Sequence, residues 1–479
     1  MMGSGKTQER IAVETTIHRI KPENVDAFSF FVRFVREFGE ENGFLLDSSS
    51  SASRAVASSI VGLFPVVSVR AKGNLLHVDG LYGLERHIQS PRETEIRGDL
   101  PALLDAVMGQ FAVQEGLAPY AFGYLGFFGY DAIRYFEAIP ETTADDREID
   151  DVHLQIHRIV VHATPEEVTV YLHDLPGVDG AVGWDTVLRL LGESHAPPVF
   201  AGYDPALLEV AEDVEFDRYV ERVKRVKEYI LAGDIFQCQV AKRMRIKGHF
   251  DTLQIYGRLR VMNPSPYMFY ARYGGYLLFG ASPEVQVRVD DGVAQMKPIA
   301  GTSKGKGATP EENARLIEQL VGDEKERAEH VMLVDLCRND LGRIAVPGTV
   351  EVKELLKVEE YSHVFHLVSL VTARVRPGVS PFEVFLATFP AGTLTGAPKV
   401  RAMEIIDEME DFHRGPYGGV IGMMDCFGNV NTAIVIRTVV CQGDTAYLQA
   451  AAGVVADSVP EQEWMECNHK LGALRATIL

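Results

Sequence analysis

The fold class is decided by the stretch VNTAIVIRTVVCQGDTAYLQAAAG, which occupies residues 430–453. A run rich in β-branched residues, 430–440, leads into the turn residues Gln442-Gly443-Asp444, and a second apolar run follows at 445–452. Two such runs around a short turn that contains glycine predict an antiparallel hairpin of long strands.

Outward from this hairpin, the hydrophobic periodicity predicts more strands and helices without the regular alternation that a parallel sheet requires. The predicted strands cover 66–69, 75–78, 152–157, 168–172 and 235–246, and the predicted helices cover 102–110, 219–230, 311–340 and a last segment with Ser458 as its N-cap. This mixture predicts an α+β fold.

One stretch is rich in residues that break regular structure. Gly192, Pro197, Pro198, Gly202 and Pro205 fall within 192–212. We therefore expect a linker at 192–212 between an N-terminal region, 1–191, and a C-terminal domain, 213–479.

The composition excludes several classes of protein. The 479 residues carry a net charge of −20, so a nucleic-acid partner is not expected. Five scattered cysteines without a CxxC pair argue against a disulfide framework and a structural zinc site. We find no leader peptide and no long apolar run, so we expect a cytoplasmic protein without a membrane span. Gly5-Lys6-Thr7 lacks the preceding strand and glycine of a phosphate-binding loop.

Two predicted helices carry glutamate pairs three residues apart. Glu326 and Glu329 form one pair, and Glu463 and Glu466 form the other. Residues at this spacing share a helix face, and two such faces opposed would gather four carboxylates that need a cation. Oxygen ligands of this kind suit Mg²⁺, although such a pair alone is more often a solvated helix face.

The local sequence leaves the role of several other residues open. Arg437 interrupts an apolar strand, so it binds an anion, pairs with a protein carboxylate or faces solvent. Lys470 can pair with the glutamate one turn earlier or bind a substrate carboxylate. His363 and His366 are either packed core residues or acid–base groups, and Glu284 by itself indicates no function.

A set of motifs occurs in a fixed order over about 213–475. They are Gly233-Asp234-Ile235-Phe236-Gln237, Ser282-Pro283-Glu284, Pro298-Ile299-Ala300-Gly301-Thr302, Ala328-Glu329-His330-Val331-Met332-Leu333-Val334-Asp335-Leu336, Arg338-Asn339-Asp340-Leu341, the segment 389–399 (FPAGTLTGAPK) and Gly453-Val454-Val455-Ala456-Asp457-Ser458. Together they resemble the chorismate-utilising enzymes, which include anthranilate synthase component I, aminodeoxychorismate synthase, isochorismate synthase and salicylate synthase. The N-terminal third matches more loosely, through 44–48 and 123–131.

Three features make the chain most similar to anthranilate synthase component I. Gln237 occupies the place of the lysine that activates water in isochorismate and salicylate synthases, and Ala300 replaces the lysine typical of aminodeoxychorismate synthases. The segment 263–269 (NPSPYMF) resembles the part that holds feedback tryptophan. The resemblance implies a large mixed fold in which antiparallel sheets pack as a sandwich flanked by helices.

The resemblance also implies roles for individual residues. It makes Glu329 and Glu466 the Mg²⁺ ligands, with Glu326 and Glu463 in support. It makes Glu284 the acid that protonates the leaving C4 hydroxyl and His366 the histidine of the second step, with Thr393 and Gln237 in the same catalytic set. The implied chorismate pocket consists of Gly301, Thr302, Tyr417, Arg437, Ala451, Ala452, Gly453 and Lys470.

A feedback site for L-tryptophan is implied at Ser48, Pro266, Tyr267 and Met268. Two positions depart from the common pattern of the family. Asp47 stands where many relatives have glutamate, and Ala451-Ala452-Gly453 replaces the common Gly-Ala-Gly.

The function that the resemblance implies is that of the large subunit of anthranilate synthase, a lyase. Chorismate and ammonia give anthranilate and pyruvate, the first committed step of tryptophan biosynthesis. No Gly-x-Cys-x-Gly nucleophile turn surrounds any cysteine, so ammonia comes either from solution or from a separate subunit. The resemblance implies the latter, a glutamine amidotransferase subunit (component II) in a heteromer. The alternatives are an aminodeoxyisochorismate synthase of secondary metabolism and a catalytically silent chorismate-binding homologue.

Overall fold

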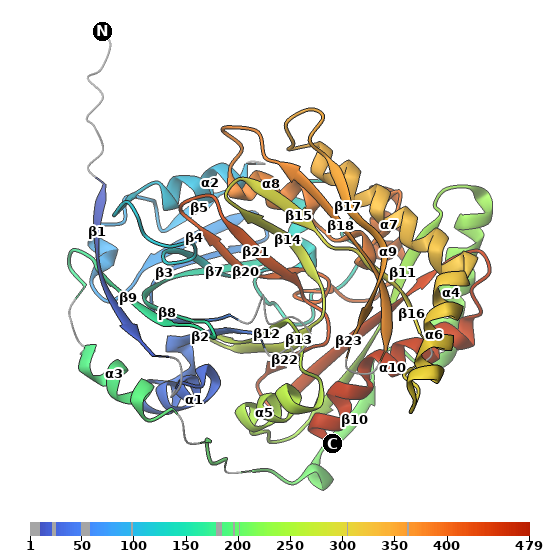
Figure 1. Cartoon of the computed structure of the whole chain (residues 1–479), viewed down its shortest axis with the longest axis horizontal. Helices are drawn as coiled ribbons and strands as arrows, with labels where there is room; N and C mark the ends of the chain where they lie inside the picture. Colours follow the sequence, from blue (N-terminus) through green and yellow to red (C-terminus); the bar gives the residue numbers. More distant parts are fainter. Residues whose placement is uncertain are drawn as a thin grey trace.

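The computed structural model describes residues 10–21, 25–48, 58–96, 99–178, 184–194, 197–200, 202–303, 305–361 and 364–479. Gly5-Lys6-Thr7, the serine-rich residues 49–53 and His363 lie outside these ranges. The α+β prediction is confirmed, because largely antiparallel strands form two stacked sheets with helices around them (Figure 1). None of the described helices has the length and apolar composition needed to span a bilayer.

The first sheet runs from the N-terminal third into the C-terminal half. Its strands, in order of pairing, are β5 (Glu93–Glu95), β4 (Leu75–Gly80), β3 (Ser59–Lys72), β8 (Val152–Ala163), β7 (Gly123–Phe128), β20 (Val420–Asp425), β21 (Val430–Ile434), β14 (Val285–Asp290), β15 (Val293–Met296) and β18 (Phe365–Arg374). Strand β16 (Ile299–Thr302) shares the edge of β18 with β15, and β17 (Glu351–Glu360) lies on its other edge.

The second sheet contains the hairpin from which the sequence analysis started. Its strands are β6 (Phe111–Val113), β1 (Ile11–Ile20), β9 (Val168–Asp174), the far halves of β8 and β3, β2 (Gly43–Asp47), β12 (Tyr267–Tyr273), β13 (Tyr276–Ser282), β22 (Thr438–Gln442), β23 (Thr445–Val454) and β11 (Gln237–Lys247). Strands β10 (Glu209–Glu212) and β19 (Gly396–Ala397) pair with the remaining edge of β11. Only β1 and β6 pair in parallel among the described strands.

The two sheets are joined at one end by the long strands β3 and β8, which run through both. The pairing of β3 with β8 shifts register between Pro65 and Val67, next to Phe64 with its positive φ of 55°. Such a bulge bends a strand and tolerates proline. As a result, the first half of β3 pairs with β2 and its second half with β4. Apolar side chains from both sheets, among them Phe44, Phe127 and Met423, fill the space between them.

At the other end of the sandwich, the chain crosses between the sheets twice. The first crossing joins β13 to β14, and the second joins β21 to β22. The prediction of one continuous strand over 430–440 is therefore wrong. The strand stops at Ile434 and resumes at Thr438, because Arg437 adopts a left-handed conformation with φ 53° and turns the chain toward the other sheet. The predicted hairpin after this break is confirmed, with Val439 opposite Leu448.

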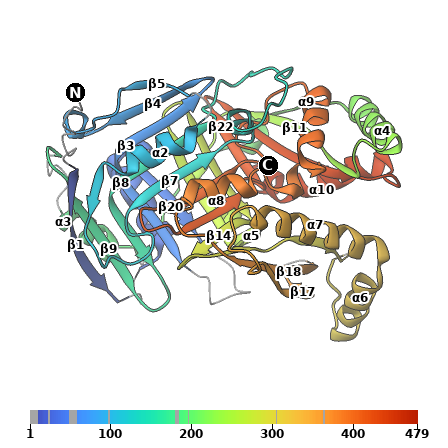
Figure 2. The ribbon, with the colours of Figure 1, turned by 90° about the horizontal axis from the view of Figure 1, so that it is seen from above.

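Helices cover the outer faces of the sandwich and one of its ends. They are α1 (Ala27–Phe38), α2 (Leu100–Met108), α3 (Trp184–Gly192), α4 (Phe216–Ala232), α5 (Thr252–Met262), α6 (Pro310–Gly322), α7 (Glu324–Gly342), α8 (Pro381–Thr388), α9 (Lys399–Met409) and α10 (Pro460–Ile478). Figure 1 shows α1, α3 and α5 below the sandwich and α2 and α8 above it. Seen from above, α6 and α7 lie beside β17 and β18 (Figure 2).

Helix ends differ from the predictions in two places. The predicted helix 311–340 is two helices, because Asp323 leaves the helical conformation and accepts hydrogen bonds from the backbone N–H groups of Lys325 and Glu326 as the N-cap of α7. Ser458 does not cap the last helix, since its hydroxyl accepts from the Val455 N–H instead. The predicted end of the helix 219–230 at Gly233 is confirmed by the left-handed cap there.

Strands from both sides of the expected linker pair with each other. Strand β2 pairs with β12, and β7 pairs with β20. The stretch 192–212 itself contains the end of α3, a short 3₁₀ turn at Pro205–Leu207 and β10. The division of the chain at 192–212 stays a prediction.

Candidate active site

Glu284 and Arg437 lie in the two crossings between the sheets, and these crossings are hydrogen-bonded to each other. The Ile434 N–H donates to the Glu284 carbonyl at 3.0 Å, and the Ala281 N–H donates to the Arg437 carbonyl at 3.1 Å. Because each crossing leaves its strand at this point, their side chains are free to turn toward the interior instead of joining a sheet face. These backbone hydrogen bonds thus hold together two crossings that carry an acid and a cation 153 positions apart in the sequence.

The guanidinium of Arg437 is half-buried and donates to the Lys470 carbonyl. Burial lowers the pKa of Arg437, and the neighbouring Tyr417 and Glu466 oppose that effect. In the part of the chain that the structure describes, Arg437 forms no ion pair with a carboxylate. Of the three possibilities that its position left open, binding an anion fits this arrangement best.

The Glu284 carboxyl is buried and has properties of a proton donor. Burial raises its pKa to about 7, while a hydrogen bond from Thr393 and the charge of Lys470 act in the opposite direction. The Thr393 hydroxyl donates to Glu284 Oε1 at 3.2 Å. A carboxyl that keeps its proton near neutral pH can serve as a general acid. A small cavity of about 30 Å³ adjoins Glu284 and Thr393.

His366 lies on β18 and, in contrast to Glu284, has the properties of a proton acceptor. Its Nδ1 atom is 3.0 Å from the Thr302 hydroxyl and 3.2 Å from the Gly301 carbonyl. Burial lowers the pKa of His366, the hydrogen bond to Gly301 raises it, and Arg437 lowers it further. The imidazole is therefore neutral at physiological pH and able to accept a proton. Tyr361 packs edge-on against the ring at 4.9 Å.

One residue that supports this strand was missed by the sequence analysis. His330 appeared only as part of a motif, yet it is fully buried and links α7 to two strands. Its Nδ1 lies 3.0 Å from the Ala300 carbonyl and its Nε2 lies 2.7 Å from the Ser369 hydroxyl. His330 follows Glu329 in a helical motif, and nothing in the local sequence marks it as a buried hydrogen-bonding residue. Its partners lie on strands that are distant in the sequence.

The predicted acidic quartet comes from two helices, α7 and α10. Glu326 and Glu329 lie on α7, which packs on β16 and β18, and Glu463 and Glu466 lie on α10, which packs on β23. Desolvation raises the pKa of Glu329, Lys325 lowers it, and the other three glutamates raise it. Desolvation likewise raises the pKa of Glu326 and of Glu463, with Glu466 adding to both.

The helices thus bring the four carboxylates within electrostatic reach of one another. Among the described residues, no three acidic, histidine or cysteine side chains lie close enough to form a metal cluster. Glu466 pairs with Lys470 at 2.6 Å, and Lys325 lies 3.8 Å from Glu329. A donor set of carboxylate oxygens, in which desolvation raises the pKa values of Glu326, Glu329 and Glu463, fits a hard divalent cation such as Mg²⁺.

The remaining pocket residues predicted from the sequence surround the strand pair β11–β23. Gly453 lies opposite Gln239, and an added Cβ would approach Gln237 Nε2 to 2.5 Å, so the Gln237 amide would have to move. Gln237 is buried, and its Oε1 makes no hydrogen bond with a described residue. Lys470 Nζ donates to the Ala451 carbonyl at 2.8 Å.

Tyr417 and Ala451 belong to a small apolar cluster with Leu394 and Ile434, next to both crossings. Ala452 is completely buried in the main core on the opposite face of β23. Its backbone therefore remains available to the pocket while its side chain does not point there. The methyl group of Ala451, one of the departures from the family pattern, is on the pocket side.

The predicted feedback residues form a separate group. Met268 lies opposite Asp47 in the pairing of β12 with β2, so Ser48 comes close to Pro266 and Tyr267. Asp47 accepts from the Ser59 hydroxyl and from Arg260 Nε, each at 2.7 Å. The hydroxyl of Ser48 is buried without a hydrogen-bond partner among the described residues. Burial raises the pKa of Tyr267 to about 12.

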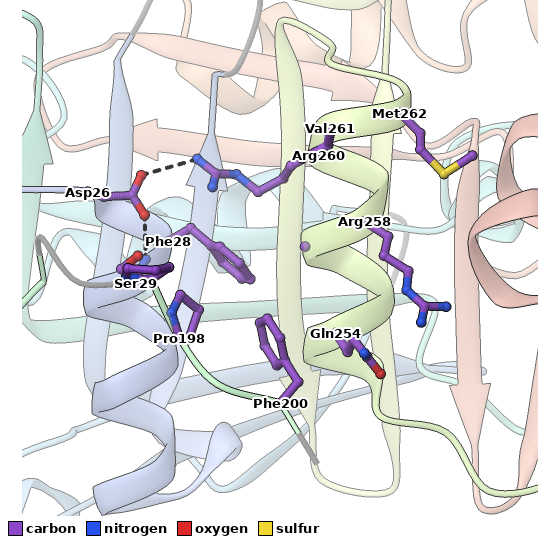
Figure 3. Close-up of a pocket in the computed structure, with 12 residues that line it drawn as sticks. Asp26, Phe28, Ser29, Pro198, Phe200, Gln254, Arg258, Arg260, Val261 and Met262 are labelled. Atoms are coloured by element: carbon purple, nitrogen blue, oxygen red, sulfur yellow. Dashed lines mark hydrogen bonds and ion pairs between the residues drawn. The ribbon is translucent and has the colours of Figure 1, made fainter. Parts of the chain in front are cut away.

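Another pocket lies away from the predicted catalytic residues. It has a volume of about 670 Å³ and lies between the start of α1, the segment 197–200 and α5 (Figure 3). Arg260 in this pocket contacts Asp26 and also holds Asp47, the neighbour of Ser48. The pocket therefore adjoins the predicted feedback residues and was not predicted from the sequence.

Comparison with known proteins gives the arrangement a family. The model of the chorismate binding enzymes matches residues 79–476. The chain belongs to this family. It is therefore a chorismate-utilising enzyme, and the crossings, Arg437 and the acidic helices all lie within the matched part.

The relatives of this chorismate-binding enzyme fall in more than one functional group. It is 39% identical to anthranilate synthase component 1 of Acetivibrio thermocellus, over 94% of this chain and 92% of the relative. It is 37% identical to a 2-amino-4-deoxychorismate synthase of Streptomyces globisporus, over 96% of both chains. Anthranilate synthase component I from Streptococcus pneumoniae TIGR4 has a similar structure, with TM-score 0.75 and 31% identity over 87% of this chain and 92% of that chain. The resemblance to anthranilate synthase component I is confirmed.

Proposed function

We propose that this chain is the large subunit of an anthranilate synthase, which converts chorismate and ammonia into anthranilate and pyruvate. The observation that carries the proposal is the pair of proton-transfer groups with opposed states, Glu284 protonated near neutrality and His366 neutral. Environments that push two titratable groups apart in this way are typical of an acid and a base working on one substrate. Tyr361 lies near both groups. Its ring packs on His366, and the charge of Glu284 is among the causes that raise its pKa, after burial and Glu359.

In the first proposed step, Glu284 gives its proton to the C4 hydroxyl of chorismate, which leaves as water. Ammonia forms a bond to C2 as the ring double bonds shift, and the product is aminodeoxyisochorismate. Thr393 holds the Glu284 carboxyl in place, and the rise of the pKa to about 7 keeps the proton available.

In the second proposed step, His366 accepts the proton from C2. The bond between C3 and the enolpyruvyl oxygen breaks, and the ring becomes aromatic. The enolpyruvate takes up a proton and leaves as pyruvate. Thr302 and the Gly301 carbonyl orient the imidazole for this transfer.

Substrate binding follows from the cations and the backbone around the crossings. Arg437 would pair with the enolpyruvyl carboxylate, and Lys470 would stand by a second carboxylate. Tyr417 and the 451–453 backbone would line the ring. The carboxylates of Glu329 and Glu466, supported by Glu326 and Glu463, would hold Mg²⁺, whose charge would neutralise them and the ring carboxylate of chorismate.

The proposal includes a partner and a regulator. Ammonia would come from a glutamine amidotransferase subunit, because no cysteine in the chain has the surroundings of an amidotransferase nucleophile. Tryptophan would inhibit the enzyme at Ser48, Pro266, Tyr267 and Met268, and the reaction would be the committed step of tryptophan biosynthesis.

A second candidate is a 2-amino-4-deoxychorismate synthase, which would stop after the first step. The observation in its favour is the 37% identity to the Streptomyces globisporus enzyme of that name along 96% of both chains. This enzyme matches the present chain along almost its whole length, so overall similarity does not distinguish the two activities. The second step, which depends on His366 in our proposal, distinguishes them.

The deciding experiment follows both products from purified chain with chorismate, ammonium salt and Mg²⁺ at mildly alkaline pH. Anthranilate fluorescence and pyruvate release, both lost with EDTA, would support the complete reaction. Loss of chorismate without pyruvate would support the second candidate. No loss of chorismate, although chorismate binds, would contradict both and support the silent homologue.

A further inference from the structure

Arg414 is the largest fully buried side chain in the described part of the chain, with 1% of its surface exposed. It lies in the loop that follows α9 and was not singled out by any pattern in the sequence. A buried guanidinium is costly unless its donors are satisfied and its charge is paired. The groups that bind the Arg414 guanidinium therefore indicate its role in the structure.

Two of its nitrogen atoms donate to backbone carbonyls of segments that carry predicted site residues. Nη1 donates to the Leu394 carbonyl at 2.7 Å, directly after Thr393. Nη2 donates to the Gln239 carbonyl at 3.2 Å, and Gln239 lies opposite Gly453 in the pairing of β11 with β23. One guanidinium thus fixes the distance between the Thr393 loop and the strand pair of the pocket.

The same guanidinium lies over two aromatic rings. Its centre is 4.6 Å from the ring of Tyr130 and 6.0 Å from the ring of Tyr417. Contacts of this length are within the range of cation–π attraction. Tyr417 is a predicted pocket residue, so Arg414 reaches a third wall of the site.

Glu410 balances the charge of Arg414 and extends the network. It accepts from Arg414 Nη2 at 2.6 Å and from Nε at 2.9 Å, and the carboxylate is almost fully buried. It also accepts from the Ala241 N–H at 3.3 Å, and Ala241 lies opposite Ala451. The ion pair therefore contacts β11 at Gln239 and at Ala241, two residues of the strand that pairs with the 451–453 backbone.

We infer that Arg414 and Glu410 are a positioning pair for the chorismate site, which set the placement of Thr393, Tyr417 and the 451–453 backbone relative to one another. The pair does not touch the substrate. It acts through the residues that do, and it rests on the proposed function only in that those residues bind chorismate. The hydrogen bonds of Arg414 go to the Leu394 and Gln239 carbonyls, which belong to segments that carry or adjoin the predicted site residues. Changes in the pair should therefore affect binding as well as stability.

The test compares Arg414→Lys and Arg414→Met with Arg243→Lys. Lysine keeps the charge of Arg414 but lacks the fork that reaches both carbonyls. Arg243 is a matched control, because it is 3% exposed and paired with Asp146 and Asp213, and among the described residues its side chain makes no hydrogen bond to a predicted site residue. The free energy of unfolding, the affinity for chorismate by calorimetry, and KM and kcat are measured for each folded variant.

We expect Arg414→Lys to weaken chorismate binding and raise KM about tenfold, with a further loss in Arg414→Met, as one well-placed interaction is worth. Arg243→Lys should lose comparable stability while its KM and affinity stay at the wild-type values. Wild-type affinity and KM in Arg414→Lys would overturn the inference, and so would losses in both lysine variants that follow stability alone. Should Arg414→Met not fold, the two lysine variants decide.

Failure of the proposed function would look different. A wild-type chain that binds chorismate but forms no anthranilate contradicts the proposed activity. The comparison of chorismate affinities among the three variants still tests the positioning pair in that case.

Discussion

Replacing the buried acid Glu284 by glutamine should make the protein more stable at alkaline pH while it abolishes turnover. The folded chain releases the Glu284 proton at a pKa of about 7, whereas the ordinary value is 4.5. Between these pH values the folded state holds a proton that the unfolded state has lost, so the free energy of unfolding falls as pH rises from 4.5 to 7 and stays lower above 7. The shift corresponds to about 3 kcal/mol.

Glu284→Gln removes this proton linkage and keeps the size of the side chain. We therefore expect the variant to exceed the wild type in stability by up to about 3 kcal/mol at pH 8, with roughly 1 kcal/mol of that difference appearing between pH 6 and 8. The turnover number should fall by about 10²–10⁴, the usual contribution of a general acid. At a fixed concentration of free ammonia, wild-type kcat/KM for chorismate should decline as pH rises through about 7, because only the protonated acid is active.

The assay is urea unfolding at several pH values between 6 and 8, together with anthranilate formation. Glu318→Gln is the matched control, because Glu318 is an exposed glutamate on α6 and its replacement should leave the pH dependence of stability unchanged. Identical slopes of unfolding free energy against pH in wild type and Glu284→Gln would refute the reasoning, since the carboxyl would then be ionised at neutral pH.

Other replacements test the remaining parts of the site. His366→Met should slow pyruvate release more than chorismate consumption, and chromatography should detect the accumulated intermediate; equal slowing of both would contradict its role in the second step. Glu329→Gln should leave the circular dichroism spectrum unchanged but raise the Mg²⁺ concentration for half-maximal activity at least tenfold, whereas an unaltered Mg²⁺ titration would remove it from the ligands. Gly453→Ala should raise KM for chorismate severalfold, because the new methyl group displaces the Gln237 amide 2.5 Å away; an unchanged KM would mean that this amide does not border the substrate. Ser48→Phe should relieve inhibition by tryptophan, measured as the concentration for half-inhibition, and a wild type that tryptophan does not inhibit would end the feedback proposal.

Local sequence patterns predicted the elements whose structure depends on near neighbours. The hairpin of β22 and β23 and the end of α4 at Gly233 are examples, because turn residues and periodicity act over a few positions. The break of the strand at 435–437 was not predicted, since the β-branched residues on both sides of Arg437 favour one continuous strand. It exists because the chain changes sheets there, which depends on strands far away in the sequence.

The site shows the same division. Family motifs pointed to Glu284, His366 and the acidic helices. In the structure Glu284 and His366 both lie near Tyr361, and the four glutamates lie within electrostatic reach of one another. Arg414 and His330 were missed because their function depends on contacts with carbonyl groups of distant segments. The local sequence around a single arginine in an irregular loop does not show whether its side chain is exposed to solvent or buried beside the site.

The order of the strands has a consequence for synthesis of the chain on the ribosome. Strand β7 is complete at Phe128, but its partner β20 begins only at Val420. At ordinary rates of translation, this gap of roughly 300 residues lasts about 15–60 s. During that time the growing polypeptide presents an unpaired strand edge on which other nascent chains can assemble. Fragments that end near residue 212 would keep this edge permanently, so recombinant production should favour the full length and a reduced growth temperature.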